Sequence, residues 1–293
     1  MATYLGTHGS KIQNYTTDPD NPNTGEVWFN ATDAVLKFQY VDTYNAWSTG
    51  GALNTARRTM AGAGLQTAAL TFGGQASPGA TNATEAYNGS SWTEVNNLTT
   101  ARVNIAGDGT QTSALAFGGK VAPARSKLTE LWNGTNWAEV NDLNTEREAL
   151  GGFGSSNTNA LAFGGEVPGS TANTETWNGT NWTEVNNLNA VGTGMAGAGT
   201  NTAGLAFGGD RGGNSALTEL WNGTNWTEVN DLNTARNSLG GAGIQTAALA
   251  FGGSTPPKSA ATETWNGTNW TETGDLATAR NQIAGSGTNT AGL

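Results

Sequence analysis

Two kinds of charged residue recur once per repeat in this chain and are its first candidates for chemistry. A carboxylate lies two residues before an aromatic residue in each unit: Glu85, Glu130, Glu175, Glu219 and Glu263. An arginine ends the connector between units, except where Gly192 takes its place: Arg57, Arg102, Arg147, Arg236 and Arg280. A ring of such charges could bind a ligand, but one polar residue per unit is more typical of an Arg–Glu or Arg–backbone contact that maintains a fold. We therefore expect a structural role, and expect the unit without arginine to be locally looser.

Other residues that perform catalysis or hold metals are scarce. The chain has no cysteine, and its one histidine is His8, so no disulfide, thiolate metal site or Ser–His–Asp set can form within the repeats. Near the N-terminus a group of oxygen ligands suggests calcium: Asp18, Asp20, Asn21, Asn23 and Glu26. Their spacing departs from that of an EF-hand loop, and prolines interrupt it. We therefore expect no metal, no cofactor and no enzymatic activity.

A further group of candidates lies where the repeats differ from one another. The variable stretches are 75–83, 120–128, 166–173, 210–217 and 254–261. They hold several of the chain's few cations: Lys120, Arg125, Lys127, Arg211 and Lys258. Variable loops on a rigid scaffold are a typical binding surface, although loops also vary because they tolerate change. We take these cations as candidate binding-face residues and leave the second explanation open.

The elements that must position these residues follow from an internal repeat with a period of 44–46 residues. Phe-Gly-Gly begins at Phe72, Phe117, Phe163, Phe207 and Phe251. A tryptophan keeps step with it: Trp92, Trp137, Trp182, Trp226 and Trp270. Each unit predicts two inner strands of small residues followed by an outer hairpin, as in 237–244, 246–253 and 261–272. Asn266-Gly267 predicts a tight two-residue turn, which would place two tryptophans diagonally across that hairpin.

The two ends of the chain carry fragments of the unit. Residues 35–49 resemble an outer hairpin, and Trp47 lies in register with Trp92. Residues 281–293 match the inner strands and stop before the next Phe-Gly-Gly. An outer pair from one end and an inner pair from the other predict a shared blade, which would hide both edges of a ring.

The prediction is therefore an all-β propeller over residues 25–293 with six four-stranded blades. Its last blade is composite and is built from 25–49 and 281–293. A strand-like segment at 25–30 could add a strand to the composite blade or replace part of its C-terminal contribution. A natural chain that continues past Leu293 would allow a seventh blade instead.

Composition narrows the class of partner. The chain has 293 residues and a formal net charge of −10, with only 12% charged residues. An acidic protein of this kind is unsuited to nucleic acid or to an anionic membrane, and no stretch is long enough for a transmembrane helix. The first residues lack the apolar core of a signal peptide. Residues 1–24 lie outside the repeat and are rich in turn residues, so we expect an arm that becomes ordered on a partner.

Each unit has Gly-Gly after an apolar run, then an aromatic residue, then tryptophan, and this order resembles that of kelch-type β-propellers. The near-identical WNGTNWTEV and LNTAR segments, with the start THGSKIQNYTTDPDNPNTGEVWFN, resemble virion proteins of marine phages that infect cyanobacteria and related bacteria. The resemblance implies a non-enzymatic tail-fibre-like or structural protein of the virion, released from the host by lysis. Its arm would bind other virion proteins, and its loops would face a host-surface glycan or a neighbouring protein.

Two other functions remain as alternatives to this interpretation. One is a stand-alone carbohydrate-binding lectin, and the other is a glycan hydrolase. Near-identical units also leave a homo-oligomer open, because blades could exchange between chains.

Overall fold

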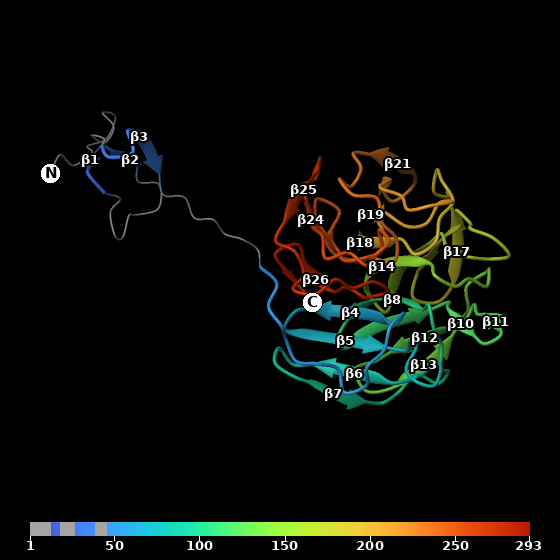
Figure 1. Ribbon diagram of the computed structural model, residues 1–293. Helices are drawn as coiled ribbons and strands as arrows, with labels where there is room; N and C mark the ends of the chain where they lie inside the picture. The colour runs from blue at the N-terminus through green and yellow to red at the C-terminus, as the bar shows by residue number, and fades with distance from the viewer. Residues whose placement is uncertain (1–12, 18–26, 39–45) are drawn as a thin grey trace. The chain divides into compact units, whose positions relative to one another are not determined.

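The computed structural model describes residues 13–17, 27–38 and 46–293. The chain divides into two units, Met1–Tyr44 and Asn45–Leu293. Within the described ranges every regular element is a β-strand, as Figure 1 shows.

The first unit contains a small sheet with the strand order β1-β2-β3. Its strands are β1 (Gln13–Tyr15), β2 (Val27–Asn30) and β3 (Val35–Phe38). β1 runs parallel to β2, and β3 runs antiparallel to it. The Oδ1 atom of Asn30 accepts hydrogen bonds from the backbone N–H groups of Thr32 and Asp33, both at 3.0 Å. This Asx turn reverses the chain between β2 and β3.

This sheet changes the expected division of the chain. We placed the boundary at residue 24 and assigned 25–49 to the propeller, whereas β2 and β3 pair with each other inside the first unit. Of the expected N-terminal contribution, only the part from Asn45 onward belongs to the second unit.

The second unit is a β-propeller with five complete four-stranded blades. Blade 1 comprises β4 (Ala61–Leu65), β5 (Ala68–Phe72), β6 (Thr84–Tyr87) and β7 (Trp92–Val95). Blade 2 comprises β8 (Ala106–Thr110), β9 (Ser113–Phe117), β12 (Thr129–Trp132) and β13 (Trp137–Val140). Blade 3 comprises β14 (Gly151–Ser156), β15 (Asn159–Phe163), β16 (Thr174–Trp177) and β17 (Trp182–Val185).

The remaining two complete blades have the same order of antiparallel strands. Blade 4 comprises β18 (Ala196–Thr200), β19 (Ala203–Phe207), β20 (Thr218–Trp221) and β21 (Trp226–Val229). Blade 5 comprises β22 (Gly240–Ile244), β23 (Ala247–Phe251), β24 (Thr262–Trp265) and β25 (Trp270–Thr273). Two short hairpins complete the unit: β10 (Lys120–Val121) with β11 (Ala124–Arg125), and β26 (Gly287–Thr288) with β27 (Ala291–Gly292).

The innermost strands follow one another around an axis. β4 contacts β8, β8 contacts β14, and the series continues through β18 to β22. β26 contacts both β22 and β4, so the C-terminal hairpin lies between the last and the first complete blade (Figure 1). The prediction of a β-propeller is therefore confirmed, with five complete blades described.

Aromatic residues join each blade to the next. The ring of Phe72 in blade 1 lies 4.8 Å from that of Trp137 in blade 2, and the indole N–H of Trp137 donates to the Thr84 hydroxyl at 3.1 Å. A Cβ atom on Gly107 of β8 would lie 2.5 Å from the same phenyl ring. In blades 2 to 5 the inner strand carries glycine at this position because the phenylalanine of the preceding blade fills the space.

Trp47 repeats this contact at the junction between the chain's ends. Its ring centroid lies 4.9 Å from that of Phe251, and its indole N–H donates to the Thr262 hydroxyl at 3.1 Å. A Cβ on Gly292 would lie 3.0 Å from the Trp47 indole. Trp47 therefore meets both blade 5 and the last strand, in the way that the tryptophan of one blade meets the blade before it.

The outer hairpins differ from the predicted two-residue turns. Trp265 and Trp270 are direct cross-strand partners, with ring centroids 5.4 Å apart, so the predicted diagonal placement is wrong. Four residues form the loop, and the Asn266 side chain accepts the backbone N–H groups of Thr268 and Asn269, both at 2.9 Å. Within this loop only Gly267 has a positive φ, +93°. The asparagine caps a longer loop here, which competes successfully with a type I′ turn.

Candidate functional site

The repeated arginines and glutamates form buried ion pairs within the blades. In blade 2, Arg102 lies 2.9 Å from Glu130, and neither side chain is exposed. Arg102 also donates to the carbonyls of Gly118 and Leu128, at 2.9 and 2.7 Å. The equivalent pairs are Arg57–Glu85, Arg147–Glu175 and Arg236–Glu263. Each pair joins the connector before a blade to the third strand of that blade.

These pairs leave little capacity for a ligand. The second oxygen of Glu175 accepts the backbone and side-chain N–H groups of Asn144, at 2.7 and 2.8 Å. Burial lowers the pKa of Arg147, and the Glu175 carboxylate opposes that shift. Both partners are therefore held within the protein, and their contacts fit the structural interpretation of the repeated charges.

Blade 4 obtains its guanidinium from another part of the chain. Gly192 occupies the connector position, and the side chain of Arg211, from the loop between β19 and β20, takes the place of the missing arginine. Its Nη1 atom donates to Glu219 at 3.2 Å and to the carbonyl of Ala190 at 2.7 Å. The expectation that this unit is looser overlooks this replacement. Arg211, a candidate binding-face residue, is 7% exposed and points into its own blade.

Arg280 differs from the other connector arginines. Its backbone N–H donates to Ser259 O at 3.0 Å, as Arg236 N–H does to Ser215 O at the same distance, but its side chain is exposed. In each complete blade the glutamate lies seven residues before the tryptophan, and the residue seven before Trp47 is Tyr40. The repeat therefore supplies no carboxylate for Arg280.

The other loop cations divide into paired and exposed groups. Lys120 and Arg125, on β10–β11, both reach Glu148 of the neighbouring connector, at 3.3 and 3.6 Å. Arg125 also pairs with Glu166. Lys127 lies 3.9 Å from Asp142. Lys258 has an exposed side chain, so the structure does not bring the five candidate cations together into one binding site.

The tips of the loops between the second and third strands are exposed to solvent. Four of the five loops between the second and third strands end in an exposed proline: Pro78, Pro123, Pro168 and Pro257. The loop of blade 4 carries Gly212 and Gly213 there, both exposed. These tips differ in sequence from blade to blade, whereas the buried residues of the blades repeat.

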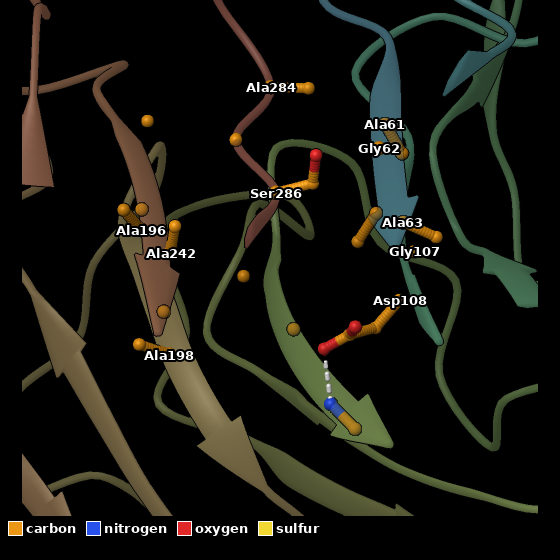
Figure 2. Close-up of a pocket in the computed structure, with 18 of the residues that line it drawn as sticks. Ala61, Gly62, Ala63, Gly107, Asp108, Ala196, Ala198, Ala242, Ala284 and Ser286 are labelled. Atoms are coloured by element: carbon orange, nitrogen blue, oxygen red, sulfur yellow. Dashed lines mark hydrogen bonds between the residues drawn. The ribbon is translucent and has the colours of Figure 1, made fainter. Parts of the chain in front are cut away.

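A cavity of about 390 Å³ follows the axis of the ring. The inner strands β4, β8, β14, β18 and β22 line it together with residues 283–287. Figure 2 shows its wall, which consists mostly of glycine and alanine. Because side chains are so small here, much of the wall is backbone. Asp108 is the one charged residue among those lining the cavity in the described part of the chain.

The Asp108 carboxylate accepts two backbone N–H groups. Oδ1 accepts from Gly109 at 2.5 Å, and Oδ2 accepts from Gly154 in the next blade. Figure 2 draws one hydrogen bond to the Asp108 carboxylate. Burial raises the pKa of Asp108 to about 7, against the opposing effect of these two hydrogen bonds. The carboxyl group therefore changes its charge near neutral pH.

Asp108 was missed by the sequence analysis, although a signal was present. The third residue of the inner strand is alanine in blades 1, 4 and 5, at Ala63, Ala198 and Ala242, but aspartate in blade 2 and Phe153 in blade 3. Comparing the repeats position by position, rather than searching for recurring charges, would have found it.

Several expectations about metals and membranes concern the N-terminal region. His8 and the calcium candidates Asp18, Asp20, Asn21, Asn23 and Glu26 lie outside the described residues. Among the residues that are described, no group of three or more His, Cys, Asp or Glu side chains could hold a metal ion. The same part of the chain contains no helix that is long and apolar enough to cross a membrane.

No protein-family model matches the sequence, and no curated protein is similar enough to it to count as a match.

Proposed function

We propose that this protein is a non-enzymatic structural or adhesion component of a phage particle, which displays a β-propeller for binding to the host surface or to a neighbouring virion protein. The observation that carries the proposal is the separation of scaffold and surface within each blade. Repeated polar residues are buried in contacts that join strands and connectors, whereas the residues that differ between blades gather in loops on one face.

The loop tips suit recognition because their backbones are restrained. Proline fixes φ, so an exposed tip such as Pro168 or Pro257 loses little conformational entropy on binding. At blade 2, Val121 to Ala124 form an exposed apolar tip, and the ion pairs of Lys120 and Arg125 hold its base. A rigid ring with differing tips is a typical layout for a binding face.

The first unit supports a display role by its separate organisation. Its strands form their own sheet, and the propeller has its own apolar core between blades. We propose that the first unit attaches the propeller to other virion proteins. The resemblance of the N-terminal sequence to phage virion proteins is the support for this assignment.

A test begins with purified phage particles. Mass spectrometry should detect this chain in them, and antibody labelling in electron microscopy should place it on the exterior. Its absence from particles would refute the virion assignment.

A second test concerns the binding face, in the full chain. Val121→Ser, Pro168→Ser and Lys258→Ser together should reduce adsorption to host cells at least fivefold. Gln66→Ser with Thr67→Ser is the matched control, because it changes exposed residues at the turn between β4 and β5, at the opposite ends of the strands. Equal adsorption by both variants would contradict the proposed face. Glycan binding without any virion partner would favour a lectin, and release of sugars would favour a hydrolase.

We also propose that the ring has six blade positions of the kelch type, the sixth being shared by the two chain ends. The contacts of β26 with β22 and β4, together with the Trp47 contacts to Phe251 and Thr262, support this arrangement. Trp47 is partly buried, so Trp47→Ala should destabilise the propeller by about 2–3 kcal/mol in urea unfolding, less than the loss at a fully buried tryptophan. Trp28→Ala, in the first unit, is the control and should leave the propeller transition unchanged. An unchanged transition in Trp47→Ala would exclude the shared blade.

A further inference from the structure

The axial cavity holds a carboxylate that the fold does not require. Blades 1, 4 and 5 form the same inner strand with alanine at the position of Asp108. Asp108 lies at the centre of β8, midway along the wall of the cavity. One-per-blade residues maintain the repeat, but this one occurs in a single blade and faces a space large enough for a small ligand.

The negative charge of Asp108 has no cationic partner among the described residues. Its two hydrogen bonds come from the backbone, from Gly109 and Gly154. The strands that contact β8 are β4, β5, β9, β14 and β15, and none of them contains a titratable residue. Asp108 is only partly exposed, and a charge with little access to water and no counter-charge is costly. Proteins compensate such a charge with an opposite charge or a bound ion, or keep the group protonated.

The rest of the cavity wall offers hydrogen-bond acceptors. Hydroxyl groups come from Thr110, Ser155, Thr200 and Ser286. The inner strands are the free edges of their sheets, and such edges leave alternate carbonyl groups without a strand partner. No positive side chain lines the described wall. The site therefore repels anions and can accept hydrogen bonds from a ligand that carries donor groups.

We propose that the axial cavity binds a small hydrogen-bond-donating cation, a primary ammonium group or a hydrated metal ion, with the Asp108 carboxylate as its charge partner. Both sources present the same chemistry, because the N–H groups of an ammonium and the waters around a metal ion each donate to carboxylate, hydroxyl and carbonyl oxygens. The cavity of about 390 Å³ is many times larger than the volume of about 30 Å³ that one water molecule takes in the liquid, so an ion with its hydration shell fits.

Binding should depend on pH in a defined direction. Burial raises the pKa of Asp108 to about 7, and only the ionised carboxylate attracts a cation. The affinity should therefore be constant well above pH 7 and fall about tenfold for each pH unit below it. A bound cation should in turn lower the pKa of Asp108.

The test uses the full chain and two probes, methylammonium chloride and magnesium chloride, at constant ionic strength. Calorimetric titration at pH 8 measures the affinity of each probe. Asp108→Ala introduces the residue of blades 1, 4 and 5 and should weaken binding at least tenfold. Glu228→Gln removes an exposed carboxylate from β21 and should leave binding unchanged. The probe that binds distinguishes an ammonium site from a metal-ion site.

A second measurement keeps the proposal testable if the alanine variant folds poorly. The carboxyl carbon signal of Asp108 in the wild-type protein reports its pKa by NMR, and the bound probe should lower that value. Failure of both probes to bind saturably and to shift this signal would overturn the proposal. Equal affinity in wild type and Asp108→Ala would also overturn it, because Asp108 would then serve only to join blades 2 and 3.

Discussion

In blade 5 the buried carboxylate of Glu263 receives its guanidinium from Arg236, in the connector before the blade. In blade 4 the carboxylate of Glu219 receives one from Arg211, in the loop between the second and third strands. The arginines occupy different positions in the repeat but approach the same oxygen of the glutamate. The fold therefore requires a positive charge at this place, and the chain can supply it from either of two segments.

The two blades also differ in the side chains that their loops expose to solvent. In blade 5 the corresponding loop ends in exposed residues, Pro257 and Lys258, whereas the loop of blade 4 directs its arginine inward. A cation in a variable loop is therefore not by itself evidence for a binding face.

The largest expected effect is that of Arg236→Ala in blade 5. The substitution leaves Glu263 buried without its partner, so the free energy of unfolding should fall by about 3–5 kcal/mol. Urea unfolding followed by tryptophan fluorescence measures this value. A loss smaller than that of Arg211→Ala would contradict the expectation that the ion pair of blade 5 contributes more to stability than that of blade 4.

Arg211→Ala in blade 4 should destabilise the protein by about 2–3 kcal/mol, because its contact with Glu219 is longer and its side chain slightly exposed. Adding Gly192→Arg to this variant should restore most of the loss, since it returns the arginine to the connector. Gly192→Arg alone should bring no gain, because Arg211 already fills the site. The double-mutant cycle decides whether the two positions are interchangeable.

A second dependence between neighbouring blades concerns Phe153 of blade 3 and Gly204 of blade 4, which share the same space. Phe153 stands where blades 1, 4 and 5 have alanine, and a Cβ on Gly204 would lie 2.2 Å from its ring. Gly204→Ala should therefore destabilise the protein by about 1–3 kcal/mol through overpacking. Phe153→Ala in the same chain should relieve this clash, and thermal unfolding would detect the recovery. Independent, additive effects would show that the two residues are not coupled.

The inner strand of blade 2 should make stability depend on pH. The pKa of Asp108 is raised from 3.8 to about 7 in the folded protein, so the folded state binds the extra proton between these values. Wild type should therefore lose stability relative to Asp108→Asn as the pH rises from about 4 to 7, and the difference should be constant beyond that range. Urea midpoints across this range provide the measurement. If wild type instead gained stability relative to Asp108→Asn as the pH rises, the pKa of Asp108 would not be raised in the folded protein.

The smallest effect is expected at Arg280. Its side chain is exposed, so Arg280→Ala should change the free energy of unfolding by less than about 0.5 kcal/mol. The same unfolding assay compares it directly with Arg236→Ala. A large loss at Arg280 would reveal a partner that the repeat does not supply.

Much of the scaffold could be predicted from local patterns. The alternating small residues of the inner strands, the Phe-Gly-Gly triplets and the paired tryptophans all recur at one period, and each acts within its own blade or on the next. The turn at Asn266-Gly267 was wrong in detail, because an asparagine side chain can cap a four-residue loop as well as form a two-residue turn. A strand pattern such as that of residues 27–38 does not by itself identify its partner strand, which here belongs to the small sheet of the first unit.

The contacts of the candidate site residues could not be predicted from local patterns. Lys120 and Arg125 resembled free loop cations, yet their partners Glu148 and Glu166 lie on the next blade. Asp108 carried no recurring pattern, and its importance depends on the cavity that the ring encloses. These properties arise between blades, where sequence separation gives no guide to distance.

The sequence by itself determined the repeating unit of this protein, its strands, and the residues that each blade buries, because these depend on side-chain periodicity and on contacts at a constant separation. Only the tertiary structure decided which guanidinium meets Glu219, and that Asp108 lines a cavity along the axis of the ring. Charge partners are selected by proximity after the blades assemble, and a loop that varies in sequence can then provide the group that the connector lacks.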